Sequence, residues 1–277
     1  LPLGEFFFRP DLLKVVLIPV GQGDSTLFML PSGQNILIDA AGQPYGNFDP
    51  GQSIVFPTLR KKGVKKIDVL VVTHPDPDHI LGAFALIKAM PIKEIWHSGF
   101  SKNHPLTSRL IAEANKKNIL VKTGKEIIKT HAFDDTTIEI LAPDHPTKDY
   151  YEKMSSNNNS LVLRISYGQH KLLWPGDLEI EGEKLLLESG KDLYAQILKA
   201  PHHGSKTSSH QEFIDRVSPE VVLYSTGKNN RFGFPHKQVV ERYQAKNIAS
   251  FNTSEDGEII IKLLKDKRFI ESYRNHL

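Results

Sequence analysis

The segment His74-Pro75-Asp76-Pro77-Asp78-His79 constrains the fold of this chain more than any other part of it. It follows the apolar residues 67–73, which predict a buried strand, and it precedes residues 80–90, which predict a helix. In proteins that alternate strands and helices, ligands bind beyond the carboxyl ends of the strands. The two prolines interrupt regular structure, so four side chains that can bind a metal converge in an irregular loop. A charged surface turn is the alternative interpretation.

The rest of the chain continues the alternation of strands and helices. Short apolar segments predict strands at 13–18, 26–30, 35–38, 94–97, 119–121, 136–141, 161–166, 171–174, 197–200, 221–225 and 258–264. The segments between them predict helices at 53–62, 107–118, 179–189, 213–217 and 236–244. Two strand-rich blocks, each followed by such alternation, predict an α/β fold with two sheets packed face to face and helices outside.

The same pattern predicts one domain over residues 13–277, after a lead-in of residues 1–12. Its two halves cover about 13–143 and 160–277, and the polar residues between them predict a connecting loop. The sequence has no apolar run long enough to cross a membrane. It starts with Leu-Pro-Leu rather than Met and has no signal-peptide pattern, so we expect processing or excision from a longer polypeptide.

Composition excludes several kinds of chemistry. The chain has no cysteine, which excludes disulfides, cysteine-type zinc fingers and a thiol nucleophile. Its formal net charge of +3 permits a nucleic-acid partner without requiring one.

Three further segments place potential ligands directly after predicted strands. Asp177 ends the segment Trp174-Pro175-Gly176-Asp177, two adjacent histidines lie in Pro201-His202-His203-Gly204-Ser205, and His236 ends Gly233-Phe234-Pro235-His236. Each segment also has an ordinary interpretation. Asp177 and His236 could begin helices, and one histidine of the pair could orient a ligand instead of binding a metal.

These segments, in this order, resemble the metallo-β-lactamase superfamily and, within it, the ComEC/Rec2 branch of DNA-uptake (competence) proteins, which carry a soluble C-terminal hydrolase-like domain. Three more segments carry the resemblance: Val20-Gly21-Gln22-Gly23-Asp24-Ser25, Leu37-Ile38-Asp39-Ala40 and Asn157-Asn158-Asn159-Ser160-Leu161. It covers nearly the whole chain. It implies a four-layer αββα sandwich of two mixed β-sheets with helices outside, and two divalent metal ions at one edge between the sheets.

The resemblance also implies a set of metal ligands. His74 and Asp76 would bind one ion, Asp78 and His79 the other, and Asp177 would bridge them. His203, with His202 as the alternative, and His236 would complete the set. Catalysis would depend most directly on Asp78, His79 and Asp177.

Other residues of the matching segments would hold the ligands in place. They are Asp24, Asp39, Asn158, Ser160 and His202. For Asp24 and Asp39 ordinary turn capping is an equally good interpretation. The superfamily's usual histidine near the middle of the chain is missing, and the segment 157–160 lies in that region.

The carboxylates of Asp76, Asp78 and Asp177 affect which metal ion the site prefers. The common pattern of the superfamily has a histidine in place of Asp76. Oxygen-rich ligand sets shift preference towards Mn²⁺ or Mg²⁺, although the general order of affinities favours Zn²⁺. We expect Mn²⁺, with Zn²⁺ and Mg²⁺ as alternatives.

Two metal ions can lower the pKa of a water and stabilise both oxygens of an in-line phosphodiester displacement. The resemblance implies a nuclease that degrades one DNA strand, with single-stranded DNA as substrate, during uptake in natural competence. It would act beside the remainder of a membrane channel polypeptide, on the outer face of the cytoplasmic membrane. The basic residues Lys199, Lys206, Lys228 and Arg231 lie near the ligand segments and would contact the phosphate backbone.

Two other functions remain open. One is a small-substrate phosphodiesterase, similar to the phosphorylcholine esterase relatives that share the His-His-Gly segment. The other is a DNA-binding module whose metals are structural. Phe234 differs from the ComEC/Rec2 branch, in which a histidine is frequent at this position beside Pro235-His236. The replacement removes a group that could donate to a phosphate and so affects the expected position of the substrate.

Overall fold

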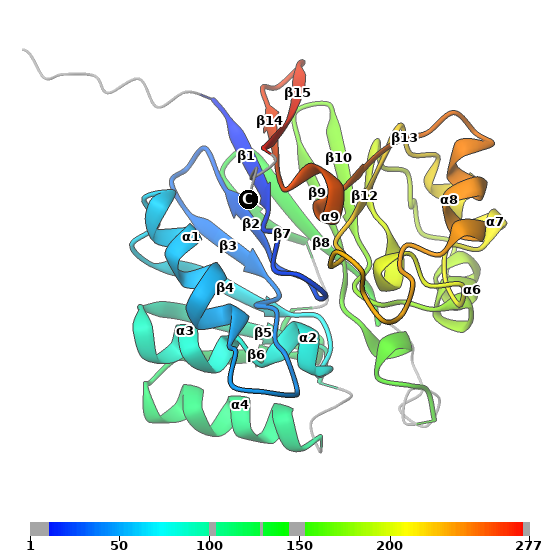
Figure 1. Ribbon diagram of the computed structural model, residues 1–277. Coiled ribbons are helices and arrows are strands. Elements are labelled where there is room, and N and C mark those ends of the chain that lie inside the picture. The colour runs from blue at the N-terminus through cyan, green and yellow to red at the C-terminus, as the bar shows by residue number, and fades with distance from the viewer. Residues whose placement is uncertain (1–10, 100–103, 128–129, 144–152, 274–277) are drawn as a thin grey trace, which may run out of the picture.

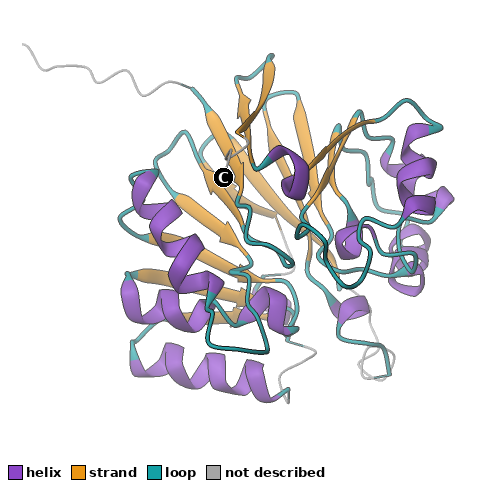
Figure 2. Ribbon diagram, viewed as in Figure 1, coloured by secondary structure: helices purple, strands orange, loops and turns teal. Residues whose placement is uncertain are grey.

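The computed structural model describes residues 11–99, 104–127, 130–143 and 153–273 of this chain. Two β-sheets pack face to face, and helices cover their outer faces (Figure 1 and Figure 2). The α/β sandwich predicted from the sequence is therefore confirmed. The first ten residues and most of the predicted connecting loop, residues 144–152, lie outside the described part.

The first sheet has eight strands in the order β15-β14-β1-β2-β3-β4-β5-β6. They are β1 (Leu13–Leu17), β2 (Thr26–Met29), β3 (Asn35–Ile38), β4 (Ile67–Val72), β5 (Ile92–His97), β6 (Leu120–Thr123), β14 (Glu258–Leu263) and β15 (Arg268–Tyr273). Strands β3 to β6 are parallel. Their carboxyl ends therefore lie at the same edge of the sheet.

The second sheet has seven strands in the order β13-β12-β11-β10-β9-β8-β7. They are β7 (Thr130–Phe133), β8 (Thr136–Ala142), β9 (Val162–Tyr167), β10 (His170–Trp174), β11 (Ile197–Lys199), β12 (Val221–Tyr224) and β13 (Ala249–Asn252). Strands β10 to β13 are parallel. This sheet too has an edge at which several strands end together.

The helices form the two outer layers (Figure 2). Over the first sheet lie η1 (Gly51–Val55), α1 (Phe56–Lys61), α2 (Pro77–Ile80), α3 (Ala83–Ala89) and α4 (Pro105–Lys116). Over the second lie α6 (Ile180–Glu188), α7 (Gln211–Val217) and α8 (Lys237–Gln244), and α9 (Thr253–Asp256) connects β13 to β14. Short turns of 3-10 helix are η2 (Gly124–Glu126), η3 (Asn157–Asn159) and η4 (Pro201–Gly204). No helix in the described residues is both long and apolar enough to cross a membrane.

Three apolar layers hold the sheets and helices together. Along β4, Val69 and Val71 pack into the layer between the sheets, whereas Leu70 and Val72 pack under the helices of the first sheet. The third layer lies between the second sheet and its helices. A strand buried on both faces needs consecutive apolar residues, and Val69-Leu70-Val71-Val72 supply them, which is why the segment 67–73 predicts a strand.

The two halves of the sequence do not correspond to the two sheets. β8 pairs with β9, so the hairpin of β7 and β8 belongs to the second sheet, whereas β14 pairs with β1 and extends the first. Each half thus contributes two strands to the sheet formed mainly by the other. The sequence pattern predicted individual strands, but it carried no information on these pairings, and it missed β7, β13 and β15.

The helix predicted over 80–90 is broken at Gly82 between α2 and α3. A Cβ atom at this position would lie 1.9 Å from the carbonyl oxygen of Ala40. Only a glycine fits at position 82 because any side chain would collide with the backbone of Ala40. This close approach holds the segment that contains His79 against the end of β3.

A buried carboxylate fixes the chain after η4. Glu183 of α6 is fully buried and accepts hydrogen bonds from the backbone N–H groups of Ser209 (2.5 Å) and His210 (2.8 Å). Burial raises the pKa of Glu183 to about 7, although these two hydrogen bonds act in the opposite direction.

We expect the substitution Glu183→Gln to change how stability depends on pH. The folded chain holds the Glu183 proton more tightly than an unfolded chain, in which the pKa is near 4.5. The contribution of Glu183 to the free energy of unfolding therefore falls as the pH rises from about 4.5 to 7, by about 3 kcal/mol in total. Urea unfolding at pH 5 and pH 8 should show this loss in the natural protein and not in the variant.

The exposed Glu188 of the same helix supplies the control. Glu188→Gln should keep the pH dependence of the natural protein. If the Glu183→Gln variant also keeps it, the carboxylate does not titrate in this range.

Candidate metal centre

The predicted ligands converge where strands of both sheets end. His74 follows β4 of the first sheet, and Asp177 and His203 follow β10 and β11 of the second. Since these strands belong to the parallel parts of their sheets, the loops after them meet at one edge of the sandwich. The structure therefore brings together segments that are about a hundred residues apart.

The carboxylate of Asp177 is the centre of this cluster. Its Oδ2 atom lies 3.2 Å from Nε2 of His79, 3.3 Å from Nε2 of His203, and 3.8 Å from Nε2 of both His74 and His202. One buried oxygen thus faces four imidazole nitrogens that come from both sheets.

Two more carboxylates lie beside the histidines. Oδ2 of Asp78 is 3.4 Å from Nε2 of His203, and Oδ2 of Asp76 is 4.0 Å from Nε2 of His74. His203 is in turn 3.3 Å from His79, measured between their Nε2 atoms. The side chains therefore fall into two groups around Asp177, one with His74 and Asp76 and the other with Asp78, His79 and His203. The resemblance implied the separation of His74 and Asp76 from Asp78 and His79 but did not assign His203 to a group, and all these ligand roles stay predictions.

Hydrogen bonds at Nδ1 fix the direction of each ring. His79 donates from Nδ1 to Oδ2 of Asp39 (2.8 Å), and His203 donates to the backbone carbonyl of Ser225 (2.9 Å). Oγ1 of Thr73 donates to Asp39 (2.8 Å) and so accepts from Nδ1 of His74 (3.0 Å). Because Nδ1 is engaged with these partners in each ring, the Nε2 atoms face Asp177.

Thr73 and Ser225 are contributors that sequence reasoning missed. Thr73 could have been found from its position, because it directly precedes His74 at the end of an apolar strand. Ser225 acts through its carbonyl group, which every residue has, so no side-chain pattern could have found it. Asp39 holds His79 and also accepts from the backbone N–H of Thr73 (2.8 Å), as expected of a residue that positions a ligand.

The two adjacent histidines have an unusual backbone. His202 and His203 have φ angles of 47° and 54°, in the left-handed region that residues other than glycine rarely adopt. The backbone N–H of His202 donates to the carbonyl of Gly176 (3.2 Å), which ties this turn to the segment before Asp177. Strain of this kind persists only where the surroundings impose it, and it is concentrated at functional sites.

Gly176 permits the close packing around Asp177. Its φ angle is 59°, and a Cβ atom there would lie 2.8 Å from Cβ of Ser160 and 3.1 Å from Cβ of Thr73. The hydroxyl of Ser160 accepts from the backbone N–H of Asp177 (3.2 Å). Oδ1 of Asn158 accepts from the N–H groups of Glu179 and Gly182, both at 3.0 Å. Ser160 and Asn158 thus hold the backbone on which Asp177 lies.

Asp24 lies behind the rings rather than in front of them. Asp24, His79, Asp177 and His203 each have a potential ligand atom within 4.8 Å of the others. However, the carboxylate of Asp24 faces the Nδ1 atoms of His203 (3.7 Å) and His79 (3.9 Å), which already have other partners. Asp24 therefore adds negative charge beside the Nδ1 atoms of the rings, and its supporting role stays a prediction.

Lys199 lies in the interior, which corrects one expectation. It was expected to contact a nucleic-acid backbone, but its side chain is 2% exposed and forms an ion pair with Asp24. A buried charge needs a partner of opposite sign, and here the partner comes from a segment 175 residues away. Lys206, Lys228 and Arg231 are exposed, as a backbone-binding position requires.

The carboxylates favour positive charge on two of the buried rings, those of His79 and His203. Burial opposes protonation of His79 and His203, but Asp177 and Asp39 raise the pKa of His79 well above its usual value. Asp177 and Asp24 likewise raise the pKa of His203 to about 9. Burial also opposes ionisation of Asp177, but His203 and His79 hold its pKa well below the usual range. The cluster thus attracts cations.

The residues present fit divalent cations. Nε2 of His74 and Oδ1 of Asp177 are buried and have no hydrogen-bond partner within the protein. Such a group costs about 1–3 kcal/mol when it is left unsatisfied. Imidazole nitrogens and carboxylate oxygens that point at one another are a donor set for transition-metal ions. A cation coordinated by these atoms would satisfy both groups.

His236 is a predicted ligand whose backbone is tied to the segment after His203. Its backbone N–H donates to the carbonyl of Gly204 (2.8 Å), and it begins helix α8. Its Nδ1 atom is buried without a hydrogen-bond partner. Among the described residues, no contact of its ring with Asp177 or another predicted ligand is observed, so its role as a ligand stays a prediction.

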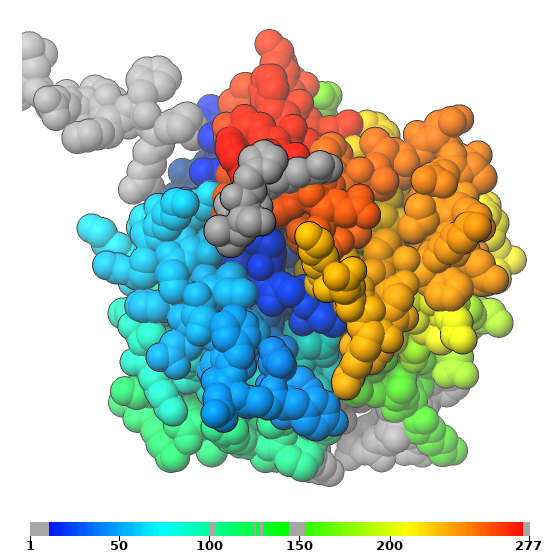
Figure 3. Space-filling view, in the orientation of Figure 1, coloured from blue at the N-terminus to red at the C-terminus, as the bar shows by residue number. Residues whose placement is uncertain are grey.

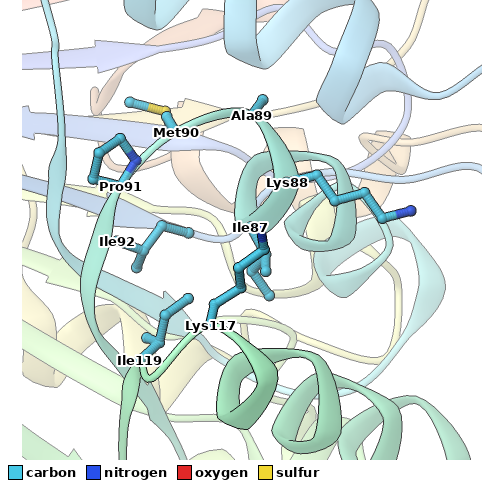
Figure 4. A pocket seen from close by; sticks show the side chains of 8 residues that line it. All are labelled: Ile87, Lys88, Ala89, Met90, Pro91, Ile92, Lys117 and Ile119. Carbon is cyan, nitrogen blue, oxygen red and sulfur yellow. The ribbon is translucent and has the colours of Figure 1, made fainter.

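The molecule also has a cavity of about 400 Å³ at the other end of the first sheet, near the start of β5 (Figure 4). Its walls carry neither a carboxylate nor an imidazole, so it lacks the groups for metal binding or acid–base chemistry. The lining residues are Ile87, Lys88, Ala89, Met90, Pro91, Ile92, Lys117 and Ile119.

Comparisons with known proteins show the family of this chain. The sequence profile of the metallo-beta-lactamase superfamily matches residues 18–228. The chain is 31% identical over 259 residues to ComE operon protein 3 of Bacillus subtilis, covering 89% of this chain and 32% of that protein. It is 29% identical over 265 residues to Competence protein ComA of Neisseria gonorrhoeae, covering 92% of this chain and 34% of that protein. The resemblance to competence proteins is thus confirmed, and the chain spans about a third of the length of these relatives.

A solved structure shows the same fold. CmlA, a diiron beta-hydroxylase from Streptomyces venezuelae, superposes with a TM-score of 0.56 at 12% identity, covering 95% of this chain and 55% of that one. At this identity the likeness concerns the fold alone, and the chemistry must be argued from the site.

We expect the substitution Asp39→Asn to weaken metal binding about 10- to 100-fold, because loss of a carboxylate that orients a ligand histidine typically has this effect. Titration with Mn²⁺, followed by calorimetry, measures the change. Asp68→Asn is the matched control, since Asp68 is a buried aspartate at the opposite end of β4. Equal affinities in the two variants would contradict the role assigned to Asp39.

Proposed function

This chain belongs to the metallo-beta-lactamase superfamily, and we propose that it is a phosphodiester hydrolase that depends on two divalent metal ions and acts as a nuclease on DNA. The observation that carries the proposal is the position of Asp177, whose Oδ2 atom lies within 3.8 Å of four imidazole Nε2 atoms. Asp76 and Asp78 lie in the two groups on either side of it, so this carboxylate would suit a ligand shared by two ions.

His74, Asp76 and Asp177 would hold one ion, and Asp78, His79, His203 and Asp177 the other. Such a pair of ions, when bound, lowers the pKa of a water and stabilises the charge that develops on a phosphodiester during in-line displacement. The three carboxylates favour Mn²⁺, or Mg²⁺, over a site made of histidines alone. His202 and His236 are the remaining candidates for these ligand sets.

The exposed side of the cluster is where a substrate would approach. The side chains of Asp76 and Asp78 are 36% and 29% exposed, whereas those of His74, His79 and His203 are almost fully buried. The histidines and Asp177 thus form the floor, held by Asp39, Ser160 and the carbonyl of Ser225. A phosphate group would meet Asp76 and Asp78 first, which is unfavourable unless cations neutralise them.

Three exposed basic residues would bind the phosphates on either side of the one that is cleaved. Lys206 follows His203 by three residues, and Lys228 and Arg231 lie in the loop before His236. The backbone N–H of Gly227 donates to Oε1 of Gln22 (3.4 Å), which fixes the start of this loop beside the segment of Asp24. These charges suit a polyanion that extends beyond the metal centre.

The relatives make DNA the preferred polyanion, since one of them is named a competence protein. We therefore propose that the chain degrades one strand of DNA, as single-stranded DNA, during uptake in natural competence. Its partner would be the remainder of a membrane channel polypeptide, and its place the outer face of the cytoplasmic membrane.

The first experiment is cleavage of end-labelled single-stranded and duplex DNA with added Mn²⁺, Mg²⁺ or Zn²⁺. We expect cleavage that requires metal and that falls to background in both Asp78→Ala and Asp177→Ala, because each variant removes a ligand. The Asp68→Asn variant should cleave at the natural rate. Hydrolysis of a small phosphodiester without cleavage of DNA would favour a small-substrate enzyme, and bound metal without any hydrolysis would favour a binding module.

A second experiment tests the basic residues. Lys206→Ala and Lys228→Ala should each raise KM for single-stranded DNA and reduce the slope of log KM against log salt by about 0.7, the value for one phosphate contact on a single strand. Lys117→Ala, in the cavity of Figure 4, should leave the slope unchanged. An unchanged slope in all three variants would exclude Lys206 and Lys228 from the binding surface.

A further inference from the structure

A row of rings leads from the metal centre to the surface. Phe234 stacks on His203 with the ring planes 20° apart and the centroids 6.2 Å apart. Phe232 stacks on Phe234, with the planes 16° apart and the centroids 5.4 Å apart. The guanidinium of Arg231 lies 4.8 Å from the ring of Phe232 and 5.7 Å from the ring of Tyr45. We call Tyr45, Arg231, Phe232 and Phe234 the aromatic rim.

The outer rings of the rim are exposed to solvent. Phe232 is 49% exposed and Tyr45 is 68% exposed. Of the seven large hydrophobic side chains that the described part of the chain exposes, these two and Phe48 lie on the loops 39–50 and 225–236. Exposed aromatic side chains that gather in this way indicate a binding surface.

The rim joins two loops that come from opposite halves of the sequence. Figure 3 shows both loops on one face, the earlier one in blue and the later one in gold, with dark blue residues of the N-terminal part set back between them. The contact of Arg231 with Tyr45 connects the two loops. The stacking of Phe234 on His203 places this surface beside the metal centre.

Aromatic rings combined with a guanidinium suit one kind of ligand in particular. Unpaired nucleobases stack on aromatic side chains and on arginine, whereas the bases of a duplex are already stacked and present only their edges. A phosphate group alone would use Arg231 but would gain nothing from Phe232 or Tyr45. The side chains of the rim therefore match a strand whose bases are unpaired.

We propose that the aromatic rim stacks unpaired bases of single-stranded DNA and thereby positions the neighbouring phosphodiester over the metal centre. This inference rests on the proposed nuclease function and adds the reason for its preference for a single strand. Phe234 is the member of the rim that contacts His203. A base stacked on Phe232 would therefore be held at a fixed position relative to the predicted metal ligands. Phe234 and Phe232 are positioning residues.

The test compares two strands that have the same backbone and charge. One carries thymine at each position, and the other carries abasic tetrahydrofuran sugars throughout. The metal-loaded natural protein should cleave the thymine strand with a kcat/KM about 5- to 100-fold higher, the range expected when one base loses its stacking partner. In Phe232→Ala combined with Tyr45→Ala this ratio should fall towards one, because the two exposed rings are lost and only Phe234 and Arg231 remain to contact a base.

Two variants serve as controls. Phe269→Ala removes a phenylalanine of β15 that is 51% exposed and lies outside the rim, and it should keep the natural ratio. Phe232→Trp retains a stacking surface and should keep a ratio well above one.

Binding is measured separately, so that the inference does not depend on cleavage. Fluorescence anisotropy with phosphorothioate versions of the two strands gives their affinities for the metal-loaded protein. If the natural protein binds the thymine strand more tightly and cleaves neither, the proposed nuclease function fails and the rim is supported. If it binds and cleaves both strands equally, or if the double variant keeps the ratio, the rim does not stack bases.

Discussion

The carboxylate of Asp177 lies among four imidazole rings in the interior, and the rest of the site is arranged to make this possible. Its oxygen is 3.2 and 3.3 Å from Nε2 of His79 and His203, which come from different sheets. A buried anion is stable only when positive charge or hydrogen-bond donors surround it. The two sheets must therefore meet with the ends of β4, β10 and β11 at one edge, and the apolar layer between them fixes that alignment.

The groups on the Nδ1 side of the rings hold the histidines in the orientation that brings them to Asp177. Asp39, Thr73 and the carbonyl of Ser225 occupy the Nδ1 side, so that the Nε2 atoms of the three rings face the front of the site. Asp24 adds a negative charge on the Nδ1 side, and Lys199 balances it in the interior. The site thus combines a rigid, hydrogen-bonded back with a front where Nε2 of His74 and Oδ1 of Asp177 have no partner in the protein, which is the arrangement expected of a preorganised metal centre.

Much of this could be predicted from the sequence, for identifiable reasons. The alternation of apolar strands and helical segments predicted the fold class, and the apolar strands indicated where the candidate ligand segments begin. The ligand set itself came from the resemblance to the ComEC/Rec2 branch and stays a prediction. Lys199 could not be placed, because its burial depends on Asp24, 175 residues away. The left-handed turn at His202 and His203 was also beyond reach, since it results from contacts with the segment of Gly176. The rim was missed for the same reason, because Phe232 and Tyr45 gain meaning only when their loops face each other.

The most direct test of the central claim is the position of bound metal. Crystals of this chain grown with Mn²⁺ should give two anomalous-scattering peaks in contact with the carboxylate of Asp177, one beside His74 and Asp76 and the other beside Asp78, His79 and His203. A single peak on the Nδ1 side of the rings, beside Asp24, or no peak near Asp177 at saturating Mn²⁺, would contradict the account.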